Sequence, residues 1–578
     1  MGKGRLDTQR IAAAALLALA VLAAGKTMLA GLEIDEQYAL SIGWRLVQGD
    51  ALFATMWEPH QLSALPAAAL LWLYTALTGT TTGVLLFVRA VMLLAKAGLS
   101  AAFYRVLQPA LPRRTAFLGA VALFLYTPKW FLGPDYISQQ FHFTLAAFLC
   151  FYSCQTRRGL WRAALGGVAM SFGVLAFPQS VFAAPVIFAG LFLLGRRSGE
   201  KRVAGVPAGA LTALAACGVC AAAFLCYVLQ ALSPAELLER AALILHDPQY
   251  DFTTAERLAL LAGQAMSVAR FLAKPALAAL ALTALAAWLG RRRGGRTADP
   301  LGLWLALFAG LATLLCLGRA VVTHGLDERT FVPVLALLGL RAFRRCRGTP
   351  RAALFWLGYL PGLAAYLFIL RSTLLGLSAT FMYLTWPGLC AVLALAMEPP
   401  APARREDPRL WADGLLGVFI AFLLACRLLL VLTTGWQPRS VFDTRMELLT
   451  TGPAAFTWVD SDTADMYHAL EQALAPHAGE QVLLSTGDVE GLAFLMDGGS
   501  LQAGQASVIS STDSDARFAQ YYELLPDKAP DVIVYNHNCV RDLEEFHAWL
   551  ESYFAISDRR TVTVGTASLE VLTVAGLQ

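Results

Sequence analysis

The chain has 578 residues, of which 57% are hydrophobic and 15% are charged, and its mean hydropathy is +0.56. About a quarter of the residues of a soluble protein are charged, so this composition excludes a soluble globular protein. Apolar runs long enough to cross about 30 Å of hydrocarbon as helices recur from Ile11 to Leu432 and then stop. The sequence therefore predicts a polytopic α-helical membrane protein.

Charge divides the chain into two parts. Residues 441–578 hold 6 Lys and Arg against 21 Asp and Glu, and residues 1–440 hold the other 39 and 20, so a tail of −15 follows a membrane part of +19. We predict a transmembrane domain at 1–436, embedded in the lipid bilayer, and a separate domain at 437–578. The acidic tail disfavours nucleic acid as a partner.

The first apolar run, Ile11–Ala30, follows three basic residues at the N-terminus. Its length exceeds the 7–15 residues that are typical of the apolar core of a signal peptide, so we expect a retained helix. Basic residues favour the cytoplasmic side, which predicts a cytoplasmic N-terminus and a cell-membrane location. The helix would then deliver the next segment to the extracytoplasmic face.

That next segment, 31–83, is predicted to be an external loop. If Leu62–Leu77 and Val84–Leu107 both crossed, the basic sequence "PRR" (112–114) would lie outside, against the positive-inside rule. Leu62–Leu77 is only about 16 residues long by the span estimate and contains Pro66. We predict that it forms a helix lying in the outer interface and does not cross.

The rest of the membrane part alternates regularly. The predicted spans are near 84–107, 115–131, 139–154, 163–178, 180–195, 203–230, 272–290, 301–321, 330–342, 353–370, 376–397 and 411–432. With the first helix this makes about 13 transmembrane helices. An odd number places the tail outside, together with the loop at 231–270.

The tail has the pattern of an α/β domain. Apolar strand-like runs at 481–486 and 531–536 alternate with helix-like runs at 463–475 and 541–554, and two further strands, "RTVTVG" and "SLEVLTV", close the chain. This predicts a small parallel or mixed sheet covered by helices. The tail has no Gly-rich phosphate loop, and we expect it to dock or to position an acceptor.

The segment 35–61, "DEQYALSIGWRLVQGDALFATMWEPHQ", carries a family resemblance. It resembles the first external loop of the GT-C superfamily of membrane glycosyltransferases, which includes the protein O-mannosyltransferases and the lipid A aminoarabinose transferase. The matching features are Asp35–Glu36, Tyr38, Arg45, Gly49 and "EPHQ". Arg89 matches the Arg that begins the second spanning helix of these families. The double proline that is common in the family is missing here.

The resemblance implies a GT-C-like glycosyltransferase that moves a sugar from a polyprenyl-phosphate donor to an extracytoplasmic acceptor, which is a cell-envelope glycan, a lipid or a protein. The implied catalytic carboxylates are Asp35, Glu36 and Asp135. The implied donor-phosphate ligands are Arg89, Arg45, His60 and Arg329. Asp35 and Asp135 are also the implied ligands of a divalent metal ion. Such a transfer needs a base for the acceptor's proton and cations for the departing phosphate.

Each candidate also has a structural alternative. Asp35 could cap the helix that follows it, and Asp135 in "GPDYIS" could cap the next one. For Lys129, snorkelling to the membrane interface is the ordinary explanation. For the whole chain, the alternatives are a transporter or lipid-linked glycan flippase without transferase activity, and a non-catalytic scaffold.

Overall fold

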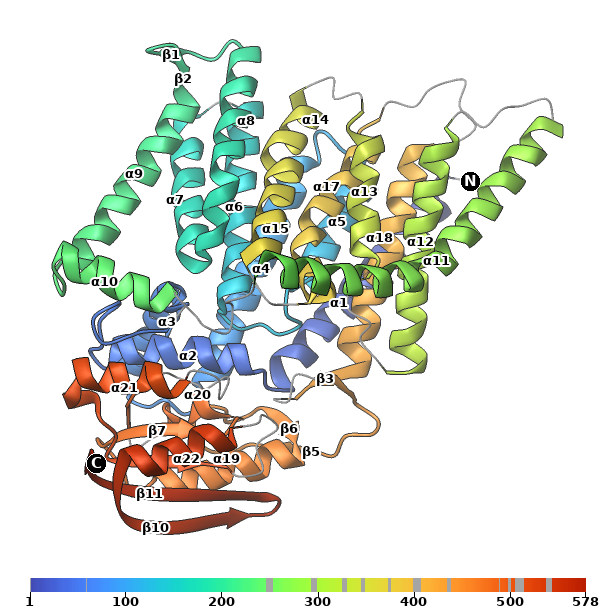
Figure 1. Ribbon diagram of the computed structural model, residues 1–578. Coiled ribbons are helices and arrows are strands. Elements are labelled where there is room, and N and C mark those ends of the chain that lie inside the picture. Colours follow the sequence, from blue (N-terminus) through green and yellow to red (C-terminus); the bar gives the residue numbers. More distant parts are fainter. Residues whose placement is uncertain are drawn as a thin grey trace.

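The computed structural model describes residues 2–58, 60–157, 159–245, 253–292, 299–324, 330–344, 349–372, 376–398, 407–433, 438–487, 489–496, 500–504, 514–536 and 543–577. Long helices run side by side through most of the chain, and the C-terminal domain sits at one end of them (Figure 1). Ten helical stretches among the described residues are long and apolar enough to cross a membrane. The predicted fold class, a polytopic helical membrane protein with a C-terminal α/β domain, is confirmed.

Every predicted span coincides with helix. The helices concerned are α1 (Gly2–Leu29), α4 (Val84–Leu107), α5 (Arg113–Leu125), α6 (Tyr136–Arg157), α7 (Leu160–Ala176), α8 (Ala184–Arg197), α9 (Ala208–Val228), α11 (Thr254–Arg292), α12 (Pro300–Val322), α13 (Val332–Ala342), α14 (Thr349–Leu354), α15 (Leu360–Ser372), α17 (Thr385–Ala396) and α18 (Pro408–Leu429). One boundary matters for the site. The span predicted at 115–131 ends as α5 at Leu125, so Lys129 lies in the following loop.

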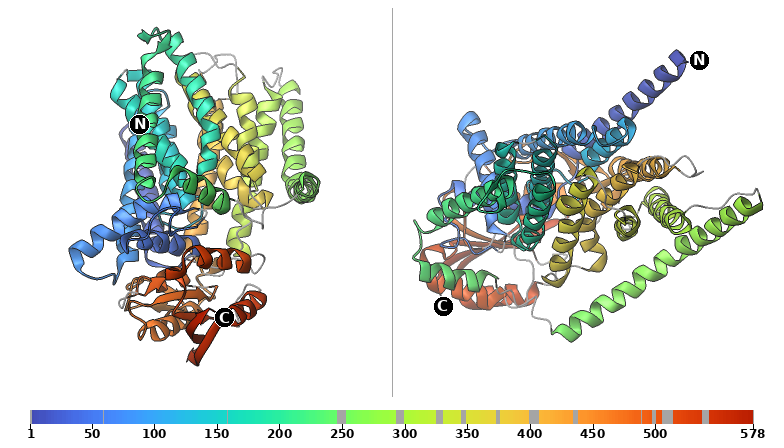
Figure 2. Two further views of the ribbon diagram at one scale, coloured as in Figure 1. Left: turned by 60° about the vertical axis from the view of Figure 1, so that its left-hand side comes forward. Right: turned by 90° about the horizontal axis from the view of Figure 1, so that it is seen from above.

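Two helices of the first loop, α2 (Ile34–Val47) and α3 (Ala64–Thr78), lie next to the C-terminal domain. Figures 1 and 2 show them across the ends of the long helices and not among them. They pack closely, since a Cβ on Gly43 would lie 2.8 Å from the Cβ of Ala67. By length and composition α3 and the turn before it could span a membrane, but its position is the one expected of an interfacial helix.

The loop predicted at 231–270 is largely helical. It contains α10 (Pro234–Leu245) and the first half of α11, which runs on through Pro275. In Figure 1, α11 bends, and the part before the bend lies across the bundle. Proline inside a helix removes a hydrogen bond and clashes with the preceding turn, which accounts for a bend at this point.

The C-terminal domain is built on a five-stranded mixed sheet with the order β10-β11-β9-β7-β8. The strands are β7 (Gln481–Ser485), β8 (Leu501–Gln502), β9 (Val532–Tyr535), β10 (Phe554–Val564) and β11 (Ala567–Leu577), and the helices are α19 (Ser461–Leu474), α20 (Glu490–Ala493), α21 (Ser514–Leu524) and α22 (Glu544–Tyr553). Strand β7 is parallel to β8 and β9, whereas β11 is antiparallel to β9 and β10. The predicted mixed sheet is confirmed, whereas β8, α20 and α21 were not predicted.

The chain enters this domain directly from the last long helix. Strand β3 (Leu430–Leu432) continues α18 and pairs with β4 (Pro438–Ser440), and β5 (Met446–Leu448) pairs with β6 (Trp458–Asp460). The predicted boundary between residues 436 and 437 lies outside the described residues, between β3 and β4. Figure 1 shows the β1–β2 hairpin (Arg202–Val203 and Val206–Pro207), which follows a basic cluster, at the opposite end of the molecule.

Candidate functional site

The site begins at the N-terminus of α2, where four acidic side chains come close in sequence or in space. Glu33 is the N-cap of this helix, because its Oε2 accepts hydrogen bonds from the backbone N–H groups of Asp35 (2.7 Å) and Glu36 (3.2 Å). The capping role that the sequence suggests for Asp35 therefore belongs to Glu33. The Asp35 side chain, in the first turn, is left available for another role.

Glu36 is completely buried and holds Arg89 of α4. The Arg89 Nε donates to Glu36 Oε1 at 2.7 Å, and its Nη2 donates to Glu36 Oε2, so the pair is bidentate. The same guanidinium donates to the carbonyl oxygens of Met28 (3.0 Å) and Gly31 (2.8 Å). A buried, bidentate pair with further backbone bonds ties α2 to the ends of α1 and α4.

Asp35 faces the opposite side and makes an ion pair with Lys129 of the α5–α6 loop. Their side chains are 14% and 11% exposed, compared with 0% for Glu36. Lys129 lies 4.9 Å from the centre of the Tyr136 ring and donates a long hydrogen bond, 3.5 Å, to its hydroxyl. The site thus has a carboxylate and an ammonium that face each other and remain partly accessible.

Asp135 completes the acidic cluster from the same loop. Its Oδ1 accepts hydrogen bonds from the N–H groups of Ile137 (2.9 Å) and Ser138 (3.1 Å), so it caps α6 as the sequence allowed. The loop packs tightly on α2, because a Cβ on Gly133 would lie 2.6 Å from Cγ of Glu36. Any side chain at this position would push the loop, with Asp135 and Lys129, away from α2.

Burial of several carboxyl groups together changes their acidity. Burial raises the pKa of Glu33 to about 8, since it outweighs the neighbouring Lys129 ammonium. Burial also raises the pKa of Asp135 above its usual range, against the effect of Lys129 and of the N–H groups that it caps. Removing water from a carboxylate disfavours its charged form. Glu33 therefore carries a proton over much of the neutral range.

A row of aromatic rings extends from this cluster. His60 stacks on Tyr136 with ring centres 3.7 Å apart, Tyr136 stacks on Phe177 at 5.8 Å, and Phe177 stacks on Tyr383 at 5.8 Å. Burial lowers the pKa of His60 to about 4, so its ring is neutral near neutral pH. The resemblance implies that His60 binds the donor phosphate. In the structure, His60 is a neutral ring that stacks on Tyr136.

The row leads to an apolar cavity of about 830 Å³ between α6, α7, α8, α15 and α17. Tyr383 lines the cavity, as do Pro128 and Ile137. Pro128 directly precedes Lys129 in the sequence, and Ile137 lies two residues after Asp135. The rest of its wall is mainly hydrophobic and aromatic, including Phe148 and Trp386. The α5–α6 loop and the start of α6 therefore border the cavity, whereas Asp35, Lys129 and Asp135 do not line it.

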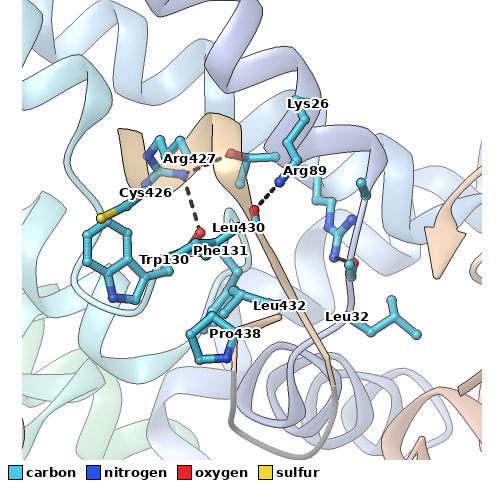
Figure 3. A pocket seen from close by; sticks show the side chains of 13 residues that line it. Lys26, Leu32, Arg89, Trp130, Phe131, Cys426, Arg427, Leu430, Leu432 and Pro438 are labelled. Carbon is cyan, nitrogen blue, oxygen red and sulfur yellow. Dashed lines mark hydrogen bonds between the residues drawn. The ribbon is translucent and has the colours of Figure 1, made fainter. Parts of the chain in front are cut away.

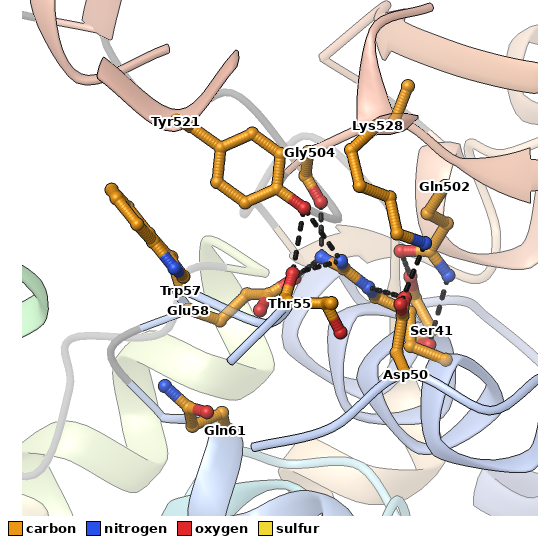
Figure 4. A network of polar contacts seen from close by, with 12 residues as sticks. Ser41, Asp50, Thr55, Trp57, Glu58, Gln61, Gln502, Gly504, Tyr521 and Lys528 are labelled. Atoms are coloured by element: carbon orange, nitrogen blue, oxygen red, sulfur yellow. Dashed lines mark hydrogen bonds and ion pairs between the residues drawn. The ribbon is translucent and has the colours of Figure 1, made fainter. Parts of the chain in front are cut away.

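Arg45 lies elsewhere, in a network that joins the first loop to the C-terminal domain (Figure 4). Its guanidinium donates to Asp50 Oδ2 (2.7 Å) and Glu58 Oε1 (2.6 Å) of the loop, and to the carbonyl of Gly504 and the hydroxyl of Tyr521 (3.2 Å) of the domain. Arg45 and Glu58 are both completely buried. Through these hydrogen bonds, Arg45 connects α2 to the C-terminal domain.

The structure brings together Asp35, Glu36, Asp135 and Arg89, and it places Arg45 away from them. Arg329 lies outside the described residues. Glu33 and Lys129 are the site residues that the sequence analysis did not select. For Lys129, the signal was a lysine only six residues before Asp135 in the same short loop.

The predicted metal site can be compared with this geometry. No group of three or more His, Cys, Asp or Glu side chains within the described ranges is arranged to hold a metal ion. Asp35 already faces the Lys129 ammonium, and Asp135 uses one oxygen as a helix cap. The described side chains therefore do not form a ready metal site, since Zn²⁺, Mg²⁺ and Ca²⁺ sites use more ligands than these two.

Comparison with known proteins finds general similarity only at the level of structure. No family model and no curated protein matches the chain. Solved structures that are similar include ArnT from Cupriavidus metallidurans without ligand (12% identity, TM-score 0.44, 99% of each chain) and bound to undecaprenyl phosphate (14%, TM-score 0.40, 100% of this chain and 99% of that one). An oligosaccharyltransferase from Archaeoglobus fulgidus, tethered to an acceptor peptide, is also similar (12%, TM-score 0.37, 97% of this chain and 74% of that one).

Both neighbours are GT-C glycosyltransferases, the class that the sequence resembles. The identities are low and the TM-scores are below 0.5.

Proposed function

We propose that the chain is a membrane glycosyltransferase that moves a sugar from a polyprenyl-phosphate donor to an extracytoplasmic acceptor. The observation that carries the proposal is the partly accessible Asp35–Lys129 pair, together with an apolar cavity that is lined by Pro128, the residue before Lys129. A lipid tail fits the chemistry of the cavity, and a phosphate fits the ammonium beside it. The carboxylate supplies the base that the transfer needs.

In the proposed reaction, the donor's phosphate draws the Lys129 ammonium away from Asp35. The acceptor's hydroxyl or amine then attacks the anomeric carbon of the sugar and gives its proton to the Asp35 carboxylate. The bond between that carbon and the phosphate oxygen breaks, and the polyprenyl phosphate leaves with the bonding electrons. Lys129 stabilises the charge that grows on the phosphate as the bond breaks.

The neighbouring residues position this pair. Glu33 holds the first turn of α2, Glu36 and Arg89 fix the helix against α4, and Asp135 fixes the start of α6. Arg89 acts in this proposal through Glu36 and does not touch the reacting phosphate. Asp35 and Asp135 are the residues that the resemblance gives as ligands of a divalent metal ion, and activity after treatment with EDTA tests that part of the prediction.

Purified full-length protein incubated with radiolabelled polyprenyl-phosphate sugars tests the proposal. We expect transfer to an added acceptor or slow release of sugar, and we expect both to be lost in Lys129→Met. Movement of the labelled lipid across a vesicle membrane without turnover would instead identify a flippase. The matched control is Lys274→Met, because Lys274 is an exposed lysine on α11 that lines neither the cavity nor the site.

The orientation is part of the proposal. The acidic C-terminal domain and the first loop with α2 and α3 share one end of the molecule, and the β1–β2 hairpin lies at the opposite end (Figure 1). Together with the positive-inside rule, this arrangement supports a cytoplasmic N-terminus and a site on the extracytoplasmic face. Labelling of Thr78→Cys, at the exposed end of α3, from the outside of intact cells is the expected result.

A further inference from the structure

A second pocket lies where α1, α4 and α18 end beside the C-terminal domain (Figure 3). It has a volume of about 430 Å³ and shares no described lining residue with the apolar cavity. Three of its lining residues are basic, namely Lys26 of α1, Arg89 of α4 and Arg427 of α18. The three basic side chains come from three different helices and converge on one space.

Arg427 is held rigidly on one side of this pocket. It is buried, and its guanidinium donates to the carbonyl oxygens of Leu125 (2.6 Å) and Trp130 (3.2 Å) and to the hydroxyl of Thr27 (3.1 Å). These contacts, with a further bond to the hydroxyl of Thr127, fix the direction of the guanidinium. A preorganised guanidinium loses little conformational freedom when it binds an anion.

The other two cations are also anchored. Lys26 donates to the carbonyl oxygen of Leu430, and Arg89 is held by Glu36 behind it. None of the 13 described residues that line the pocket is Asp or Glu. Glu36 compensates the charge of Arg89, so the like charges that face the pocket are those of Lys26 and Arg427. Two like charges in a partly desolvated pocket repel each other, and a bound anion would offset that repulsion.

The loop that closes the pocket has an unusual backbone. Trp130, which lines the pocket, has φ = 65°, a left-handed conformation that is rare for a bulky residue. Its carbonyl is the one that Arg427 contacts, and its ring lies 6.0 Å from that guanidinium. Backbone strain of this kind is retained where the surroundings require one geometry.

We propose that this pocket binds a phosphate anion, separately from the donor site at Lys129. Guanidinium and ammonium groups together are the protein groups best suited to phosphate. The source of the phosphate is either a lipid head group or free phosphate. Both sources fit the location, since Leu32, Leu430 and Leu432 line the rim at the ends of membrane helices.

Binding to the delipidated full-length protein in nonionic detergent tests this proposal. One arm measures radiolabelled inorganic phosphate by equilibrium dialysis. The other measures, by native mass spectrometry, the retention of phosphatidylglycerol against diacylglycerol, which lacks the phosphate. The variant is Lys26→Met, because Lys26 is outside the proposed catalytic machinery, and the control is Lys274→Met.

We expect saturable binding of one phosphate probe to the wild type and to Lys274→Met, and about 10-fold weaker binding to Lys26→Met, as for the loss of one charge-assisted contact. Retention of phosphatidylglycerol alone would identify a lipid head group, and binding of inorganic phosphate would identify the free anion. Equal binding by Lys26→Met and Lys274→Met, or no binding of either probe, would overturn the proposal.

Lys129→Met separates this pocket from the proposed donor site. It should leave phosphate binding in the second pocket unchanged, even if it abolishes turnover or if the chain has no transferase activity at all. Loss of phosphate binding in Lys129→Met would show that the probe had occupied the Lys129 site, which would contradict a second pocket. Thermal unfolding of each variant without phosphate checks that the fold is retained.

Discussion

Asp35 and Glu36 are neighbours in sequence, but they have opposite environments. Glu36 is buried and held by both sides of the Arg89 guanidinium, whereas Asp35 is partly exposed and faces the single ammonium of Lys129. Successive residues on a helix point about 100° apart, so one carboxylate turns toward α4 and the other toward the α5–α6 loop. Burial and pairing thus assign one carboxylate to structure and leave the other for chemistry.

The largest expected effect comes from the buried member of the pair. Glu36→Gln removes the charge that compensates Arg89 and leaves a buried cation, so the folded state should lose about 3–5 kcal/mol. Chemical unfolding in detergent, or the yield of folded protein, measures this. Asp35→Asn is the matched control, because it lies one residue away and is partly exposed.

Similar losses in both variants would break the comparison. It would mean that the two carboxylates share one structural role.

The next effect concerns Lys129, the cation that faces Asp35. Lys129→Met should weaken donor binding by about 1.5–3 kcal/mol, roughly 10- to 150-fold, because it removes a charge-assisted contact to phosphate. Binding of a radiolabelled polyprenyl-phosphate sugar to protein in detergent provides the measurement. Unchanged donor affinity in Lys129→Met would contradict the assignment of Lys129 to the donor phosphate.

A smaller effect concerns the acid that caps α2. The folded state raises the pKa of Glu33 from 4.5 to about 8, so the folded protein binds more protons at this group than the unfolded chain between these values. Its contribution to stability is complete below about 4.5 and is lost as the pH rises through about 8. Glu33→Gln should therefore flatten the fall in stability between pH 6.5 and 8.

The pKa of His60 is lowered from 6.5 to about 4, so its own effect on the pH dependence of stability falls below pH 6.5 and outside this window. Unfolding followed at several pH values in this range checks the result. An unchanged pH dependence in Glu33→Gln would mean that another buried acid, such as Asp135, is responsible.

Much of the fold could be predicted from the sequence because its signals are local. Apolar runs fix the long helices. The basic clusters predict that Leu62–Leu77 does not cross, and this stays a prediction, because Gln61–Thr78 is long and apolar enough to span a membrane. The strands of the C-terminal sheet were also visible as apolar runs. Of the elements that were not predicted, β8 and α20 carry too few residues to give a pattern, whereas α21 has 11 residues.

The site was predicted less completely because its contacts are not local. Arg45 finds its partners Gly504 and Tyr521 at separations of 459 and 476 residues, which no sequence spacing reveals. Lys129 seemed to belong to a span because apolar residues surround it, and only the end of α5 at Leu125 places it in the loop. Glu33 takes the cap because Oε2 reaches two N–H groups, a choice among three nearby acids that composition cannot make.

The division between Asp35 and Glu36 is tested most directly by Asp35→Asn in a single-turnover assay with bound donor. Asparagine keeps the shape of the side chain but cannot accept the acceptor's proton. We expect donor binding and thermal stability close to those of the wild type, and sugar transfer slower by about 100-fold or more, in line with the usual contribution of a general base. Transfer at the wild-type rate, or a loss of activity explained entirely by unfolding, would contradict the catalytic role of Asp35.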